Sequence, residues 1–367
     1  MPIRPLEVWS LGVVDYAAGL AIQEKLVAWR RAGDIPDMLL LLEHPPVITL
    51  GRAAEARNIV VPATVLASRG VSVHETRRGG DVTYHGWGQL VGYPILDLNP
   101  DRRDIRRYMR DLEEVLIGAV GEYGVAAGRV AGLTGVWVAG ERKIAALGVH
   151  ISRWITSHGF ALNVTTDLRD FSCIIPCGIQ DKAVTSIAHE TGLTPSLEEV
   201  GGQVARRFSE TFEREAIRRE VAQASAQVVV FRTRAGRREY LALRRVAARG
   251  GFWQLITGRI QAGEAPLDAA RRELLKTGLV ALGLHDLALT RTYLADADWL
   301  APAAAHPVFS REHAFAALAD ADCIRLSPDE HDAYEWLDFE TAQARLAWEG
   351  DRQALRQARE AIPGRFL

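Results

Sequence analysis

The residues with the clearest chemical potential are one cysteine and one lysine on separate segments. Cys177 stands between Pro176 and Gly178, and Lys143 lies in the segment 142–148. A free thiol has a pKa of about 8.5, and a neighbouring ammonium group favours the reactive thiolate. A thiolate can attack an acyl thioester at little energetic cost, and an amine can then attack the new thioester to give an amide. A lysine in its amine form can take up the proton that the attacking amine loses. The pair therefore indicates acyl transfer.

Taken singly, these two residues also have a plainer interpretation. A lone cysteine after a proline is typical of a small buried apolar position, and a lone lysine is typical of a solvated surface. The catalytic interpretation therefore depends on the sequence that surrounds Cys177 and Lys143.

Composition limits the classes of protein to which the chain can belong. Its 367 residues suit two domains of ordinary size, and 48% hydrophobic with 25% charged residues are typical of globular cores. A net charge of −2 does not indicate that the protein binds nucleic acid through its overall charge. Three scattered cysteines are too few for a disulfide framework, and no CxxC spacing indicates zinc. We expect no metal, no cofactor and no nucleic-acid partner.

The first residues of the sequence and the length of its apolar segments indicate where the protein is located. The first residues lack an apolar run of signal-peptide length, and no segment approaches about 18 uninterrupted apolar residues. We therefore expect a cytoplasmic protein with no membrane partner.

The pattern of apolar residues predicts alternating strands and helices in the first part of the chain. Strands are expected at 6–14, 38–43, 47–50, 135–139, 143–151 and 159–164. Helices are expected at 15–31, 101–120 and 196–220, the first with Asp15 as N-cap and the last with a Ser-Leu-Glu-Glu capping box. The glycine-rich segment 77–92 reads as a loop or hairpin that lines a site.

A change of composition near residue 220 predicts a domain boundary. Residues 222–227 are small and polar with little to pack, and a strand at 228–231 is followed by a basic turn and a return strand at 239–246. We therefore expect one domain over residues 1–220 and a second over 226–367.

Several segments of the first domain resemble one family. The segment 78–93, Arg-Gly-Gly-Asp-Val-Thr-Tyr-His-Gly-Trp-Gly-Gln-Leu-Val-Gly-Tyr, is similar to the signature of lipoyl(octanoyl) transferases, the acyltransferases of lipoate synthesis. The resemblance continues in register through Glu43-His44-Pro45-Pro46, Thr49-Leu50-Gly51-Arg52, Gly135-Val136-Trp137-Val138, Arg142-Lys143-Ile144-Ala145-Ala146-Leu147-Gly148-Val149, His158-Gly159-Phe160-Ala161-Leu162-Asn163-Val164, Pro176-Cys177-Gly178-Ile179 and Val184-Thr185-Ser186. It covers roughly residues 5 to 215.

This resemblance implies a fold, a reaction and its partners. The fold is the α/β one shared with biotin and lipoate protein ligases, and the donor is octanoyl-acyl carrier protein. Cys177 would form the octanoyl thioester, and Lys143 would act as general acid and base. The acceptor is a lysine on the lipoyl domain of a 2-oxoacid dehydrogenase or on the glycine-cleavage H protein. The residues implied to line the acyl pocket are Arg78, Gly79, Gly80, Asp81, Val82, Thr83, Tyr84, His85, Ala146, Leu147, Gly148, Gly159, Phe160 and Ala161.

Two further features concern the acyl chain and the donor. Trp87 stands where the family usually has proline, and a bulky side chain there could narrow the pocket. Arginines at 102, 103, 106, 107 and 110 could form a docking strip for the acidic carrier protein, although the interleaved acids could equally pair with them.

The second domain resembles the Nudix family, an α/β/α sandwich. Gly258-Arg259-Ile260-Gln261-Ala262-Gly263-Glu264, followed after seven residues by Arg272-Glu273-Leu274, looks like a Nudix box. A working box continues with two glutamates that hold divalent metals, whereas here Leu275-Lys276-Thr277-Gly278 follows. Lys276 also brings a positive charge to the metal position. We therefore predict no hydrolase activity and leave the role of this domain open between a sensor, a binding module and a stabilising one.

Three alternatives compete with the octanoyltransferase interpretation. An ATP-dependent lipoate or biotin ligase of the same fold needs no cysteine nucleophile and carries a Gly-Arg-Gly-Arg-x-Gly loop, which this sequence lacks. A non-catalytic binding protein would not need the Cys177 and Lys143 pair. An active Nudix hydrolase or nucleotide-sensing fusion is opposed, as a hydrolase, by the missing glutamates.

Overall fold

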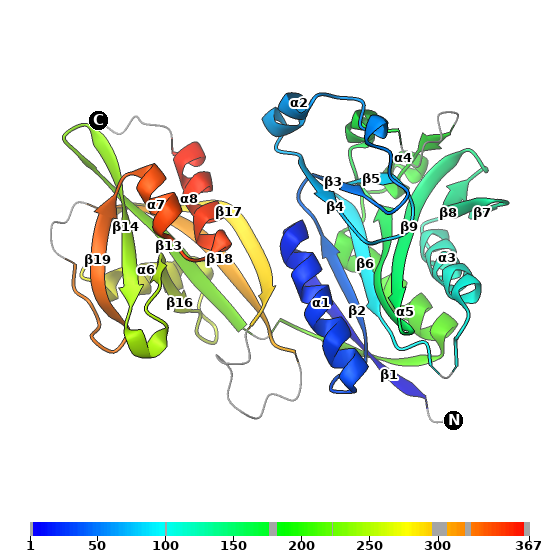
Figure 1. The fold of residues 1–367 in the computed structure, drawn as a ribbon, viewed down its shortest axis with the longest axis horizontal. Helices are drawn as coiled ribbons and strands as arrows, with labels where there is room; N and C mark the ends of the chain where they lie inside the picture. Colours follow the sequence, from blue (N-terminus) through cyan, green and yellow to red (C-terminus); the bar gives the residue numbers. More distant parts are fainter. Residues whose placement is uncertain are drawn as a thin grey trace. The chain divides into compact units, whose positions relative to one another are not determined.

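The chain divides into two compact units. The computed structural model describes residues 3–99, 101–175, 182–221, 223–295, 307–319 and 324–362. The first unit comprises Met1–Val221, with which Tyr293–Val308 is grouped, and the second comprises Ala222–Thr292 and Phe309–Leu367. Each unit is built on its own sheet (Figure 1).

A nine-stranded sheet forms the frame of the first unit. In spatial order its strands are β12 (Arg214–Arg219), β1 (Arg4–Val13), β2 (Asp37–Glu43), β6 (Gln89–Ile95), β10 (Ile155–Asn163), β9 (Arg142–Ser152), β8 (Leu133–Val138) and β7 (Ala127–Val130), with β11 (Ala183–Val184) beside β9. β1 is parallel to both of its neighbours, and the pairs from β2 to β7 are antiparallel. A second, small sheet has the order β4 (Ser72–Glu75), β3 (Val47–Leu50) and β5 (Val82–His85).

Helices cover the large sheet. α3 (Ile105–Gly121) and α5 (Leu197–Phe212) pack against one another and share a core with strand residues such as Leu39, Leu41 and Leu162. α1 (Tyr16–Ala32) packs against β6 and β10. The central strand β2 is buried from Asp37 to Leu42, as expected for a strand covered on both faces. Shorter elements are η1 (Ala56–Asn58), α2 (Ala63–Ser68), η2 (Leu168–Cys173) and α4 (Ile187–Thr191).

Two of the expected helix starts are confirmed, and one helix end was wrong. Asp15 caps α1, and Ser196 and Glu199 form the capping box of α5. The last helix was expected to reach residue 220, but it ends at Phe212 because Glu213 adopts a left-handed φ of 54° and β12 follows. Pairing with β1 and burial of the Arg214 guanidinium against Asp37 outweigh the local helical pattern there.

The second unit is an α/β/α sandwich. Its sheet has the order β15 (Trp253–Gln254), β14 (Arg237–Arg245), β13 (Gln223–Arg234), β18 (Phe309–Ala319) and β17 (Ala281–Leu294), with β16 (Ile256–Arg259) beside β13 and β19 (His331–Leu337) beside β14. α6 (Pro266–Lys276) covers one face, and α7 (Phe339–Arg345) with α8 (Glu349–Ala361) covers the other (Figure 1).

The strand β13 shows how the sequence builds this sandwich. Val228 and Val230 belong to the core under α6, whereas Val229 and Phe231 belong to the core under α7 and α8. Successive side chains of a strand point to opposite faces, so a continuous apolar run serves both cores. The segment 223–227, expected as a linker, forms the start of β13, where it pairs with β16 and β18.

One close contact in the large sheet predicts a specific sensitivity to substitution. Phe160 of β10 stands opposite Gly92 of β6, and its ring occupies the space that a Cβ at position 92 would need. We expect Gly92→Ala to lower the free energy of unfolding by about 1–3 kcal/mol, since the ring or the strand must shift. Gly128→Ala is the control, because a Cβ at Gly128 of β7 meets nothing within 4 Å. Urea denaturation of both variants checks this, and equal effects would contradict it.

Candidate active site

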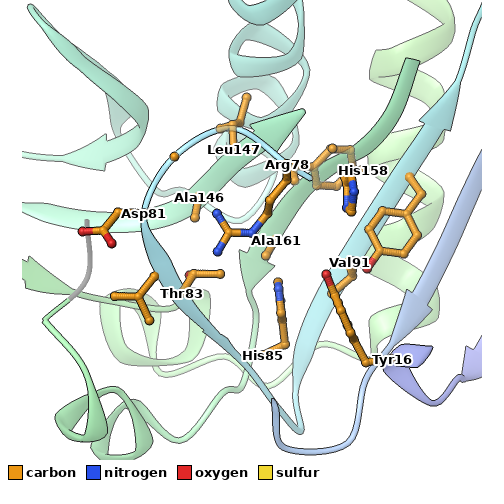
Figure 2. Close-up of a pocket in the computed structure, with 16 residues that line it drawn as sticks. Tyr16, Arg78, Asp81, Thr83, His85, Val91, Ala146, Leu147, His158 and Ala161 are labelled. Carbon is orange, nitrogen blue, oxygen red and sulfur yellow. The ribbon is translucent and has the colours of Figure 1, made fainter. Parts of the chain in front are cut away.

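A cavity lies between the large sheet, the small sheet and α1. The space between its atoms is roughly 500 Å³ when the open mouth is included. Figure 2 shows its labelled side chains around a common space, with Asp81 and Thr83 at one end and Tyr16, Val91 and His158 at the other. The lining residues are Tyr16, Arg78, Gly80, Asp81, Val82, Thr83, His85, Val91, Tyr93, Ala146, Leu147, Gly148, His158, Gly159, Phe160 and Ala161.

The structure brings most of the sequence-predicted pocket residues to this cavity. Twelve of the fourteen line it, and the exceptions are Gly79 and Tyr84. Gly79 instead docks its segment on β9, because its N–H donates to the Val149 carbonyl over 2.9 Å. Tyr84 lies in a separate buried cluster, where its hydroxyl donates to Asp170 over 2.8 Å.

Arg78 fixes the glycine-rich segment to the small sheet. The buried guanidinium donates to the Thr49 carbonyl over 2.6 Å and to the Thr49 hydroxyl over 2.9 and 3.1 Å, and its third nitrogen donates to the Gly79 carbonyl. A charge-assisted network of this kind holds the loop rigid. Gly148 allows the close approach, because a Cβ there would lie 2.9 Å from the Gly79 oxygen.

Lys143 lies in a second, smaller cavity that adjoins the first. This cavity is lined by Lys143, Gln89, Asn163, Phe171 and Val184, and it shares Thr83, Ala146 and Ala161 with the larger one. The lysine is 7% exposed, and its ammonium lies 4.7 Å from the centre of the Trp137 ring. An amino group is thus buried beside the wall of an apolar cavity.

A chain of hydrogen bonds joins the two cavities. The His85 Nδ1 lies 2.7 Å from the side-chain oxygen Oε1 of Gln89 and must donate to it, since that oxygen can only accept. The Gln89 amide donates to Asn163 over 2.9 Å, and the Asn163 amide donates to the Thr185 carbonyl over 2.9 Å. Burial lowers the pKa of His85 to about 3, so its ring is neutral with the Nε2 unprotonated.

The predicted nucleophile Cys177 lies outside the described residues, but the chain on both sides of it is described. Phe171 lines the Lys143 cavity six residues before Cys177, and Val184 lines it seven residues after. Val184 also pairs with Lys143 across β11 and β9, and the Thr185 N–H donates to the Lys143 carbonyl. The described residues that flank Cys177 on both sides, Phe171 and Val184, therefore lie at this cavity.

The sequence reasoning missed four residues that line the larger cavity: Tyr16, Val91, Tyr93 and His158. Val91, Tyr93 and His158 stand inside the segments that carried the resemblance, so their neighbours gave a signal. Tyr16 is the first residue of α1, far along the chain from the other lining residues, and no local pattern marked it.

Trp87 and Cys173 lie away from the larger cavity. Trp87 is 54% exposed and lines neither the larger cavity nor the Lys143 cavity, so its side chain does not narrow the pocket. Cys173 is buried in a cluster with Tyr84 and Phe171, so its side chain packs in the protein interior.

The arginines near α3 are mostly engaged within the protein. Arg102 is 3% exposed and pairs with Asp111, Arg110 donates to Glu113 over 2.6 Å, and Arg103 stacks on Trp154. Arg107 also lies 3.8 Å from Asp111. The interleaved acids therefore pair with three of the five arginines, which favours internal pairing over a docking strip.

In the second unit, internal cations hold the two surviving acids of the Nudix-like box. Arg272 donates to both oxygens of Glu264 over 2.7 and 2.8 Å, which lowers the pKa of Glu264 to about 2. The Lys276 ammonium donates to both oxygens of the buried Glu273 over 2.8 and 2.9 Å. Across the described residues, no group of three or more His, Cys, Asp or Glu side chains is placed to hold a metal ion.

A buried acid pair lies on the other face of this sheet. Asp351 of α8 is 3% exposed, accepts a hydrogen bond from the Gln227 amide over 2.5 Å, and lies near Glu312, which pairs with Arg291. Burial, reinforced by the charge of Glu312, raises the pKa of Asp351 to about 8. Asp351 is therefore protonated in the folded protein at neutral pH.

The helices of the described chain were also compared with the requirements of a bilayer. None of them combines the length and the apolar content that a membrane crossing needs.

Two family models match the chain, one for each unit. The lipoyl protein ligase A/B catalytic domain matches residues 15–209, and the NUDIX domain matches residues 221–358. The octanoyltransferase of Myxococcus xanthus is 44% identical over 362 residues, which cover 97% of this chain and 99% of that protein. The octanoyltransferase of Solibacter usitatus is 56% identical over 208 residues, covering 57% of this chain and 93% of the relative. The alignment with the Myxococcus protein thus spans both units.

A solved structure supports the fold of the first unit. The bi-partite lipoate protein ligase and its E2 lipoyl domain from Thermoplasma acidophilum give a TM-score of 0.50 at 19% identity, covering 60% of this chain and 88% of the matched one. The expected α/β fold of the biotin and lipoate ligases, followed by a Nudix sandwich, is confirmed.

The protonated Asp351 predicts a dependence of stability on pH. The carboxyl of an unfolded chain has a pKa of about 3.9. The folded state therefore holds an extra proton between about pH 4 and pH 8, and the stability that this gives is lost as the pH rises through about 8. We expect the urea midpoint of the full chain to fall between pH 6 and pH 9. The urea midpoint of Asp351→Asn, a variant that keeps the side-chain shape and the oxygen that accepts from Gln227, should fall less over the same pH range. An equal fall would contradict the proton that we assign to Asp351.

Proposed function

Because the chain belongs to the octanoyltransferases of the lipoyl protein ligase A/B family, we propose that it takes its octanoyl group from octanoyl-acyl carrier protein and passes it through a thioester on Cys177 to a lysine of a lipoyl domain. It is an acyltransferase of lipoylation with a C-terminal NUDIX domain. The proposal concerns the donor, the covalent intermediate, the acceptor and the residues that carry the reaction.

One observation carries this proposal: the larger cavity adjoins the buried Lys143. Val91, Ala146 and Ala161, together with the rings of Tyr16 and Tyr93, give the cavity apolar surface that suits a hydrocarbon chain. Thr83, Ala146 and Ala161 form the wall shared with the Lys143 cavity. An acyl tail in the larger cavity would place its carbonyl at this wall, beside the Lys143 amine.

The proposed reaction balances with Cys177 and Lys143 alone. The Cys177 thiolate attacks the donor thioester carbonyl, and the Lys143 ammonium protonates the departing thiolate of the carrier. The acceptor lysine then attacks the enzyme thioester as an amine, Lys143 takes up the proton that it loses, and the Cys177 thiolate leaves. The thiolate and ammonium pair is thereby restored, and no metal, ATP or redox partner enters the sequence of steps.

The acceptor proposal rests on the family and on one structural relative. The relative from Thermoplasma acidophilum is described as a ligase with its E2 lipoyl domain. For this chain we propose a lysine on a lipoyl domain of a 2-oxoacid dehydrogenase or on the glycine-cleavage H protein.

Mass spectrometry of the intact chain tests the covalent step. After mixing with octanoyl-acyl carrier protein in the absence of ATP, the wild-type chain should gain one octanoyl group that hydroxylamine removes. Cys177→Ala should gain none, and Lys143→Met should acylate about 100-fold more slowly, as expected for loss of a general acid. Cys173→Ala is the matched control and should behave as wild type. A folded chain without an adduct, or an adduct that needs ATP, would refute the thioester route.

For the second unit we propose a NUDIX fold that has lost its hydrolase activity. Lys276 stands at the metal position and its ammonium neutralises Glu273, so a divalent cation would have to displace an internal ion pair. This unit would then act through binding or through stability, not through hydrolysis.

Metal binding and hydrolysis can be measured separately for this unit. The full chain with Mg²⁺ or Mn²⁺ should release no phosphate or pyrophosphate from a panel of nucleoside di- and triphosphates above the blank. Lys276→Glu removes one of the two cations that pair with Glu273, the other being Arg272, and adds a carboxylate, so this variant should bind Mn²⁺ in a titration where the wild-type chain does not. Metal-dependent release by the wild-type chain would overturn the proposal.

A further inference from the structure

The larger cavity has an open end and a closed end. Gly80 at one end is exposed, and Ala146 and Gly148 beside it are partly exposed. At the other end, Tyr16 is 2% and Tyr93 4% exposed. Figure 2 shows Tyr16 on the side of the cavity opposite Asp81 and Thr83, the latter being part of the wall shared with Lys143. A chain that enters beside Lys143 therefore points toward Tyr16.

One face of α1 forms this closed end. Tyr16, Gly19 and Gln23 recur at helical spacing and so lie on the same face. The Gln23 side chain accepts the N–H of His158 over 2.6 Å, which supports the left-handed φ of 55° at that residue. A Cβ at Gly19 would lie 3.1 Å from the His44 ring, so the helix stands as close to that ring as its backbone permits.

Hydrogen bonds and ring contacts fix the aromatic side chains of the closed end. The His44 Nδ1 donates to the Val14 carbonyl over 2.6 Å, which leaves its Nε2 to accept from the Tyr93 hydroxyl over 2.7 Å. The Tyr16 ring lies 5.1 Å from the His44 ring and stacks on His85 at 6.0 Å between centroids. A wall of interlocked rings cannot move aside for an additional methylene group without disturbing several contacts.

The same wall is uncharged at neutral pH. Burial lowers the pKa of His44 and of His158 to about 4 and that of His85 to about 3, and it raises the pKa of Tyr16 to about 12. These rings therefore present no ionised group of their own to a hydrocarbon terminus.

We propose that the Tyr16 ring, held between His44 and His85, is the stop that sets the length of the acyl chain. This inference rests on the proposed function, which assigns the larger cavity to the acyl chain. On this assignment an octanoyl chain ends at the Tyr16 ring, and longer chains would meet the ring. Trp87, whose side chain is exposed away from the cavity, has no part in this limit.

Acyl-chain selectivity tests the stop directly. The wild-type chain and Tyr16→Ala are assayed with hexanoyl-, octanoyl-, decanoyl- and dodecanoyl-acyl carrier protein, and kcat/KM is determined for each donor. Removing the ring should raise the decanoyl to octanoyl ratio of kcat/KM about 15-fold, since each of two newly accommodated methylenes contributes roughly fourfold. Tyr16→Phe keeps the ring and should keep the wild-type ratio. Tyr16→Leu should give an intermediate ratio and serves if the alanine variant does not fold.

The controls separate this inference from the function on which it rests. Tyr123→Ala removes a partly buried tyrosine packed against the core under α3 and should leave the ratio unchanged, so a general loss of stability cannot mimic the result. An unchanged ratio in Tyr16→Ala and Tyr16→Leu, with a wild-type chain that transfers octanoyl, would refute the stop and leave the proposed function standing. A wild-type chain that transfers no acyl group from any carrier donor would refute the proposed function itself.

Discussion

The first unit depends on very small residues in the part of the large sheet that forms the floor of the cavity. Beneath the cavity, the neighbouring strands β9 and β10 present Ala146, Gly148, Gly159 and Ala161. Their small size is enforced from outside the cavity, since a Cβ at Gly148 would crowd the Gly79 carbonyl and one at Gly159 would collide with the backbone of Gly92. The backbone contacts that hold the sheet and the glycine-rich segment together are thus the same contacts that keep the cavity open.

How much of this could be predicted from the sequence depended on whether the information was local. The segments around Arg78 and Ala146 identified most of the cavity wall, because they carry the resemblance to the octanoyltransferases and that resemblance implies an acyl pocket there. Tyr16 was missed because it reaches the cavity from a helix, and an amphipathic pattern does not say which buried residue faces a ligand. The extension of α5 beyond Phe212 failed for a similar reason: the pairing of β12 with β1 joins segments about 210 residues apart, and no local propensity encodes it.

The two units treat buried charge in opposite ways. In the first, Lys143 is buried beside a cavity, where its amino group can meet a ligand. In the second, each acid of the box is already held by a cation of the same box, Glu264 by Arg272 and Glu273 by Lys276. An internal ammonium satisfies a buried carboxylate without the coordination demands of a metal ion, so Glu273 has a charge partner in the fold without a bound cation.

The division of the site into an apolar cavity and a polar one also locates its pH dependence. His44, His85 and His158 have pKa values of about 3 to 4, so they stay neutral wherever the protein is active near neutral pH. Binding of the hydrocarbon chain should therefore vary little with pH across that range, because none of these three rings gains a charge there. The proposed transfer chemistry belongs to the other side of the site, at the wall that the larger cavity shares with the Lys143 cavity. The closed end would then act on the acyl chain through its shape.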